Sequence, residues 1–152
     1  MKRTMQLAAA AVAALLLLSG CGTSGLSAAS VTGTSVPESW TGDDKDGVCA
    51  YLESYNHLPG NYMTKKEARK YGWEGGALHL TVPGGCIGGD AFGNYEGRLP
   101  EYKDYKECDI DTLASDTRGG KRIVYSVDEE DLDIWYTADH YESFNLLYGD
   151  GL

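Results

Sequence analysis

The sequence predicts an α+β domain in which N-terminal helices pack on a twisted antiparallel β-sheet. Apolar residues recur at helical spacing from Val48 to Tyr55, and a second helix start follows at Thr64. Five short β-prone runs come afterwards, separated by turn-forming Gly, Asn and Asp. Helices followed by a run of adjacent strands are typical of the α+β class. About 110 residues, 43–152, form one domain with one modest core.

Two helices are expected at the start of this domain. The first starts at the segment 41–44, with acidic residues in its first turn, because negative charge stabilises a helix N-terminus. It ends at 58–61, where Pro and Gly occur. Its apolar stripe consists of Val48, Tyr51, Leu52 and Tyr55. The second begins after Thr64, where Glu67 completes a capping box, and Gly72 ends it.

The strands are expected in the second half of the domain. The β-prone runs are residues 86–92, 105–110, 122–127, 134–138 and 141–147. A run of adjacent strands after the helices indicates an antiparallel sheet.

The N-terminal segment is predicted to be an export signal, residues 1–20, followed by a flexible linker, residues 21–42. Two basic residues precede the apolar run 7–18, which is too short to span a bilayer comfortably. The sequence Leu-Ser-Gly before Cys21 resembles a bacterial lipobox, which makes Cys21 a candidate for lipidation; an ordinary cleavage point near 27–30 is the alternative. We therefore expect an extracellular protein, secreted or anchored to the outer face of the bacterial cell membrane.

The mature chain is strongly acidic. Without Lys2 and Arg3, 11 basic and 23 acidic side chains remain, a formal net charge of −12. Non-specific binding of a polyanion depends on neutralising its phosphates with Lys and Arg. Any nucleic-acid site must therefore be local rather than a basic face.

Charged residues within the predicted strands and turns are the informative candidates for chemistry. A carboxylate, Glu107, a histidine, His140, and two cations, Arg118 and Arg122, are the groups needed to cleave RNA through its own 2′-hydroxyl. That chemistry requires no metal and no cofactor. Each residue alone also has a structural interpretation, a solvated histidine or a surface ion pair, so composition by itself does not identify the reaction.

Ordered motifs extend along the whole predicted domain and are more specific than any single residue. They include Asp46-Gly47-Val48, Leu58-Pro59, Gly72-Trp73, Ile87-Gly88-Gly89-Asp90, Asn94, Glu96-Gly97, Leu99-Pro100, Glu107, Asp109-Ile110, Arg122-Ile123, Tyr125-Ser126, and Thr137 to Tyr141. With these motifs the chain resembles the barnase family of microbial guanyl-preferring ribonucleases over about residues 46–148. The resemblance implies the microbial ribonuclease fold.

The resemblance also implies catalytic roles. Glu107 matches the general base and His140 the general acid, with the roles exchanged when the cyclic phosphate is hydrolysed. Lys65, Arg118 and Arg122 match the cations that hold the scissile phosphate.

Two further acids match structural support for these cations. Asp109 matches a buried acid that pairs with both arginines, and Asp90 matches an acid near Lys65.

Loop 93–97 matches the family's guanine-recognition loop, which makes Asn94, Tyr95 and Glu96 substrate-binding candidates. A carboxylate such as that of Glu96 can accept both N1–H and N2–H of guanine. Tyr141 matches the aromatic residue that packs near the base. A plain β-turn is the alternative interpretation of this loop.

The chain departs from the family at two places. Tyr95 stands where the family carries an arginine, and residues 128–131 form an acidic insertion at a hairpin tip. We therefore expect this chain to bind RNA more weakly than a basic relative does. Its affinity for the family's inhibitor should be reduced more steeply still.

Three cysteines remain besides Cys21, and their spacing fits no zinc pattern. If Glu107 faces the cleft, Cys108 faces the core, because strand residues alternate. Cys49 lies on the apolar stripe of the first helix. We therefore expect a Cys49–Cys108 disulfide, with Cys86–Cys108 as the alternative.

These observations predict a metal-independent endoribonuclease that cleaves single-stranded RNA 3′ to guanosine through a 2′,3′-cyclic phosphate. RNA is the expected substrate, a barstar-like intracellular inhibitor the expected partner, and a monomer the expected state. The main alternative is a non-catalytic exported binding lipoprotein with the same fold, but a retired enzyme is expected to have lost one of its catalytic residues, and none is missing. A glycosidase that uses Glu96 and Glu107 has no support beyond the two acids.

Overall fold

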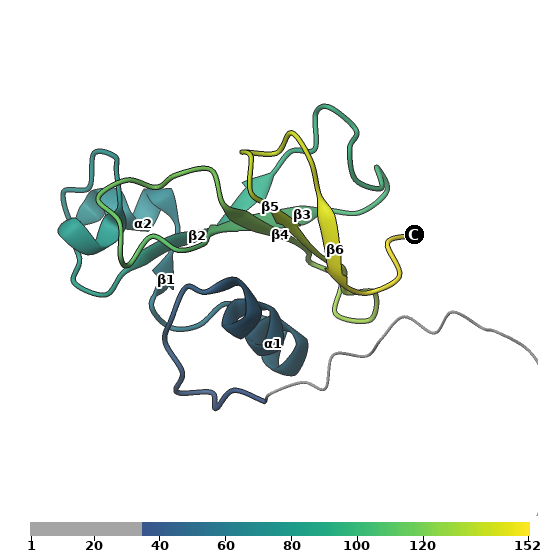
Figure 1. Ribbon diagram of the computed structural model, residues 1–152, viewed down its shortest axis with the longest axis horizontal. Helices are drawn as coiled ribbons and strands as arrows, with labels where there is room; N and C mark the ends of the chain where they lie inside the picture. The colour runs from purple at the N-terminus through teal and green to yellow at the C-terminus, as the bar shows by residue number, and fades with distance from the viewer. Residues whose placement is uncertain (1–34) are drawn as a thin grey trace, which may run out of the picture. The chain divides into compact units, whose positions relative to one another are not determined.

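The computed structural model describes residues 35–152 (Figure 1). Its elements in chain order are α1 (Lys45–Tyr55), β1 (Tyr62–Met63), α2 (Lys65–Lys70), the 3₁₀ turn η1 (Leu78–Leu80), β2 (Cys86–Phe92), β3 (Tyr105–Asp109), β4 (Arg122–Ser126), β5 (Ile134–Thr137) and β6 (Asn145–Tyr148). None of the helices in this part of the chain is long and apolar enough to cross a membrane. The predicted export signal and Cys21 lie outside the described residues.

A six-stranded sheet forms the centre of the domain, with its strands in sequence order from β1 to β6. Strand β1 runs parallel to β2, and every other neighbouring pair is antiparallel. The prediction of an α+β fold with an antiparallel sheet is therefore confirmed. The parallel strand β1 was not predicted, because two residues are too few to show a β pattern.

Helix α1 begins at Lys45, directly after the aspartates that were expected in its first turn. Asp44 is the N-cap, and its side chain accepts a hydrogen bond from the Gly47 amide at 2.8 Å. The helix ends at Tyr55, earlier than predicted, because Asn56 adopts the left-handed conformation (φ 55°). Its amide donates to the Leu52 carbonyl at 2.9 Å, which closes the last turn.

The segment before α1 contacts the helix, although it falls within the range assigned to the linker. The hydroxyl of Tyr51 donates to the Glu38 carbonyl at 2.9 Å, and that of Tyr55 donates to the Val36 carbonyl at 3.0 Å. Trp40 packs against the main core. Residues 36–40 therefore belong structurally to the domain.

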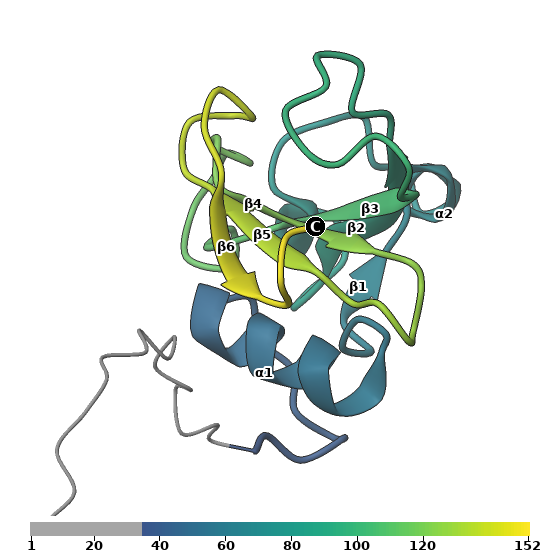
Figure 2. The same cartoon turned by 90° about the vertical axis from the view of Figure 1, so that its right-hand side faces the viewer.

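The two faces of the sheet are covered differently. Helix α1 packs on one face, and the long loops after β2 and β5 lie on the opposite side (Figures 1 and 2). The main core, under α1, includes Val48, Leu52, Cys108, Ile110, Ile123 and Ile134. A smaller cluster contains Leu99, Tyr105 and Val124. Because alternate residues of β3 face opposite sides, Cys108 joins the α1 core and Tyr105 joins the second cluster, as strand parity predicts.

The predicted disulfide is wrong: Cys49, Cys86 and Cys108 are all free and buried. Parity placed Cys49 and Cys108 in the same core correctly, but a bridge also requires the two sulfurs to meet. The Cys49 thiol instead donates to Glu53 at 3.4 Å, one turn along α1. The alternative bridge is absent too, because the Cys86 sulfur accepts from Asn61 at 3.6 Å and from Thr112 at 3.8 Å.

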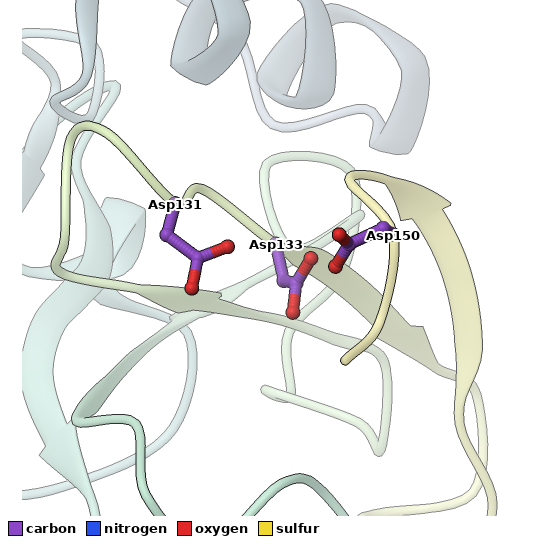
Figure 3. A group of neighbouring side chains, drawn as sticks. All are labelled: Asp131, Asp133 and Asp150. Carbon is purple, nitrogen blue, oxygen red and sulfur yellow. The ribbon is translucent and has the colours of Figure 1, made fainter.

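Three aspartates gather where the C-terminal segment crosses the β4–β5 hairpin. Figure 3 shows Asp131, Asp133 and Asp150 side by side, and their carboxylate oxygens lie within 4.8 Å of one another. The ammonium of Lys103 lies 2.9 Å from Asp131 and 2.7 Å from the fully buried Asp133. The Gly151 amide donates to the other Asp133 oxygen at 3.1 Å. Lys103 therefore supplies positive charge to this cluster.

Candidate active site

One cavity of about 350 Å³ brings together every catalytic and substrate-binding residue predicted from the sequence. It opens on the side of the sheet opposite α1, beneath the loops that follow β2 and β5. Its lining is Lys65, Ala91, Phe92, Gly93, Asn94, Tyr95, Glu96, Glu107, Arg118, Arg122, His140 and Tyr141. The two supporting acids, Asp90 and Asp109, are not part of this lining and contact residues that are.

Glu107 lies at the centre of β3 and is 7% exposed. Lys65 Nζ donates to its Oε1 at 2.7 Å, and the Tyr141 hydroxyl donates to its Oε2. Burial alone raises the pKa of Glu107, but the hydrogen bonds from Lys65 and Tyr141 and the charges of Lys65 and Arg122 outweigh it. The net pKa is lowered, so Glu107 is ionised at neutral pH.

Lys65 owes its position to the start of α2. The predicted capping box is present: Thr64 Oγ1 accepts from the Glu67 amide at 3.2 Å, and Glu67 accepts from the Thr64 amide at 2.9 Å. Asp90 accepts a hydrogen bond from the Lys65 amide at 2.9 Å. A register shift in β2 between Gly88 and Asp90 places Asp90 opposite Glu107. Asp90 therefore ties the backbone of Lys65 to the strand beside the carboxylate that Lys65 contacts.

Asp109 holds the two arginines together. It is 1% exposed and accepts from Arg118 Nε and Nη2, both at 2.7 Å. Arg122 Nε lies 2.9 Å from Asp109 Oδ1, without the alignment of a hydrogen bond. The hydrogen bonds to Asp109 raise the pKa of Arg118. One buried carboxylate thus neutralises part of the repulsion between two guanidinium groups that line the cavity.

His140 lies in a turn that strand periodicity did not predict. His140 and Tyr141 both have positive φ, 57° and 75°, so residues 141–144 do not extend β6, which begins at Asn145. The His140 amide donates to the Gly120 carbonyl at 3.1 Å. A Cβ at Gly120 would lie 3.2 Å from that amide nitrogen. Glycine therefore lets the His140 turn lie against the turn between Arg118 and Arg122.

Asp139 and Thr137 support this turn and were not predicted from the sequence. Thr137 Oγ1 donates to Asp139 at 2.8 Å and accepts from the Tyr141 amide at 3.0 Å. Asp139 also accepts from the Ser143 hydroxyl and amide. The Ser143 hydrogen bonds, together with that of Thr137, lower the pKa of Asp139 to about 2. The Thr-x-Asp-x-x-x-Ser spacing was the available signal, since these side chains commonly close turns.

Loop 93–97 forms the other wall of the cavity. The Asn94 amide group donates to the Leu99 carbonyl at 2.8 Å and accepts from the Leu99 amide at 3.1 Å. Its side chain therefore fixes the conformation of the loop. Glu96 is exposed, and Tyr95 is 98% exposed. The ring of Tyr141 packs 5.1 Å from Phe92, which gives the cavity an aromatic side.

A further contact joins the two walls of the cavity. Arg98, just after the loop, donates to the backbone carbonyl of Glu142 in the His140 turn. No sequence signal identifies this pair, because a backbone acceptor can belong to any residue. The contact links the loop to the turn that carries the histidine.

Comparison with known proteins places the chain in a family. A family model described as ribonuclease matches residues 45–148. Ribonucleases of Bacillus intermedius and Bacillus pumilus are each 45% identical over 106 residues, 67% of this chain and 63% of each relative. A ribonuclease of Heyndrickxia coagulans is 45% identical over 103 residues, 65% of this chain and 91% of the relative.

A more distant relative carries a more specific name. Guanyl-specific ribonuclease St of Saccharopolyspora erythraea is 42% identical over 60 residues, 38% of this chain and 56% of the relative. The match to the two Bacillus proteins spans 63% of their length. The family model covers more than half of this chain, and the fold agrees with it. The chain therefore belongs to the ribonuclease family, of the barnase type that its motifs resemble.

Proposed function

We propose that the domain is a metal-independent endoribonuclease that cleaves single-stranded RNA on the 3′ side of guanosine. The observation that carries the proposal is the convergence of Glu107, His140 and three cationic side chains in one cavity beside loop 93–97. The reaction is transphosphorylation to a 2′,3′-cyclic phosphate, followed by hydrolysis.

Glu107 acts as the base in the first step. It takes the proton of the 2′-hydroxyl as that oxygen attacks phosphorus. Both carboxylate oxygens are already hydrogen-bonded, to Lys65 and Tyr141, so the 2′-hydroxyl must share or displace one of these partners. A bound phosphate competes for Lys65 and adds negative charge, and both effects raise the pKa of Glu107. Substrate binding thus makes the carboxylate a stronger base.

His140 acts as the acid, and the cations stabilise the charge. The histidine protonates the departing 5′-oxygen as its bond to phosphorus breaks, and in hydrolysis it removes a proton from water while Glu107 returns one. Arg118 and Arg122, oriented by Asp109, stabilise the added negative charge of the phosphorane. Side chains supply all the positive charge, which is why the proposal includes no metal.

Guanine recognition is proposed for Glu96 and the backbone of the loop. A carboxylate can accept from N1 and N2 of guanine together, a donor pair that adenine, cytosine and uracil lack. The guanyl-specific name of the more distant relative supports this proposal. The ring of Tyr141, in the same cavity, provides a surface beside the base.

Incubation in EDTA with a short RNA containing one guanosine, and with its DNA counterpart, tests the proposal. Cleavage of the RNA alone, 3′ to the guanosine and through a 2′,3′-cyclic product, is the expected result. The variant Arg69→Ala, at an exposed residue of α2 outside the cavity, is the matched control for Arg118→Ala. Absence of cleavage by the folded protein would favour the alternative of a non-catalytic binding lipoprotein with the same fold.

We also propose export, with a lipid anchor at Cys21, on the basis of the N-terminal sequence pattern alone. Mass spectrometry of the mature N-terminus distinguishes a lipidated cysteine from ordinary cleavage. A ribonuclease endangers its producer before export, so an acidic cytoplasmic inhibitor like barstar is a further proposal. Calorimetric titration with barstar tests it, and weak binding is expected because of Tyr95 and the acidic surface.

A further inference from the structure

A second cavity lies behind the recognition loop. Its volume is about 650 Å³, within the range of small-molecule sites. It shares residues 91–95 with the catalytic cavity, and its remaining lining is Glu101, Lys103, Asp104, Tyr105, Lys106 and Val127. None of Glu107, His140 or the arginines lines it. The two cavities therefore meet at the loop, with the catalytic groups on one side only.

Tyr95 lines both cavities. Its side chain is 98% exposed, which is unusual for so large an aromatic group. The ring lies against Gly93, because a Cβ at Gly93 would be 2.4 Å from Tyr95 Cε2 and 2.5 Å from Cζ. Asn94, between them, is fixed by its two hydrogen bonds to Leu99. Tyr95 is therefore a ring supported on one side and open to solvent on the other.

The charges of the second cavity favour a neutral base over a phosphate. Glu101 and Asp104 are exposed carboxylates in the lining. Of the two lysines there, Lys103 is committed to Asp131 and Asp133, so the two carboxylates face one exposed ammonium, that of Lys106. Carboxylates repel phosphate but accept hydrogen bonds from amino groups. The exocyclic amino groups of adenine and cytosine provide such donors, whereas uracil has no amino group.

We propose that this cavity binds the nucleotide on the 5′ side of the guanosine, with its base stacked on Tyr95. The inference rests on the proposed function, because it uses the direction of the RNA chain. With the guanine in the loop, the scissile 3′-phosphate lies towards Glu107 and His140. The 5′ side then leads away from them, across Tyr95 and into the second cavity. Adenine and cytosine are preferred there over uracil.

The test compares kcat/KM for GpU, pGpU, UpGpU and ApGpU, cleaved by the wild type and by Tyr95→Ala. Stacking of one base on an aromatic ring changes affinity by between about fivefold and 150-fold. We expect ApGpU to exceed GpU by about tenfold, with UpGpU between them. Tyr95→Ala should remove most of this gain, and Tyr95→Phe should keep it. Because pGpU carries the 5′ phosphate without a further base, its kcat/KM distinguishes a gain due to the base from a gain due to the phosphate.

Control variants separate stacking from general damage. Tyr71 is also exposed, at the end of α2 and outside both cavities, so Tyr71→Ala should leave the ApGpU to GpU ratio unchanged. The double variant Glu101→Gln with Asp104→Asn should reduce the preference of ApGpU over UpGpU. Equal rates on GpU and ApGpU, or a ratio unaffected by Tyr95→Ala, would overturn the inference while leaving the proposed function intact. No cleavage of any guanosine substrate would overturn both.

Discussion

Replacing Lys103 with methionine tests a buried ion pair outside the candidate active site. The side chain of Lys103 is 3% exposed and contacts Asp133, which is fully buried, at 2.7 Å. Breaking a buried pair by removing one partner costs about 3–5 kcal/mol, against a total stability of roughly 5–15 kcal/mol for a domain. We therefore expect a loss of about 3–5 kcal/mol in the free energy of unfolding.

Urea denaturation followed by far-UV circular dichroism measures this loss. The double variant Lys103→Met with Asp133→Leu should recover most of it, because a buried pair replaced by apolar residues is often neutral or stabilising. The matched control is Lys121→Met, which removes an exposed pair with Asp111 at 2.6 Å and should cost far less than Lys103→Met. Similar losses for Lys103→Met and Lys121→Met would refute the reasoning, as would a double variant no more stable than Lys103→Met.

The same pair predicts alkaline sensitivity. Burial lowers the pKa of Lys103, but the hydrogen bonds and charges of Asp133 and Asp131 outweigh it and raise the pKa above its usual value. The stability that Lys103 contributes is therefore complete below the unfolded lysine pKa of about 10.4, and it is lost as pH rises through the higher folded pKa. As pH rises above about 10.4, the free energy of unfolding of the wild type should fall by this contribution. That of Lys103→Met should show no such fall, because the variant lacks the ammonium group.

Four further predictions concern the site and the thiols. His140→Ala should lower kcat/KM by about 10²–10⁴-fold with little change in Tm, and retained activity would contradict its role as the acid. Glu96→Ala should equalise cleavage after guanosine and adenosine, measured on paired substrates; an unchanged ratio would exclude Glu96 from base recognition. Because the pKa of Glu107 is lowered, kcat/KM should fall on the acid side only below the usual carboxyl pKa of about 4.3, and a fall that begins above about pH 5 would contradict this. The stability that the ionised Glu107 contributes should likewise be lost as pH falls through its folded pKa. Cys49, Cys86 and Cys108 should react with a thiol reagent only after unfolding, and rapid labelling of any of these three in the native protein, located by peptide mapping, would contradict their burial.

Local patterns predicted the elements that carry most of the site. The capping box at Thr64 and Glu67 fixed the start of α2 and hence the place of Lys65. Strand parity placed Glu107 and Cys108 on opposite faces. These features depend on residues within one turn or one strand, so a single sequence is enough to show them.

Features that depend on contacts across the fold were missed. Positive φ at His140 and Tyr141 has no periodic signature in residues other than glycine. The contact of Lys103 with Asp133 joins residues 30 positions apart. The Cys49–Cys108 bridge failed for a related reason, since parity identifies a face and not the distance between two sulfurs.

Because three thiols are buried in the fold, whether they are oxidised depends on whether the chain folds before it meets an oxidant. Burial raises the pKa of Cys49 and of Cys86 to about 12, and that of Cys108 well above its usual value, so within residues 35–152 the folded protein contains almost no reactive thiolate. An unfolded chain has ordinary thiols and can form any of three wrong disulfides in an oxidising compartment. In such a compartment, folding must therefore be faster than oxidation. In the laboratory, refolding needs a reductant that storage of the native protein does not.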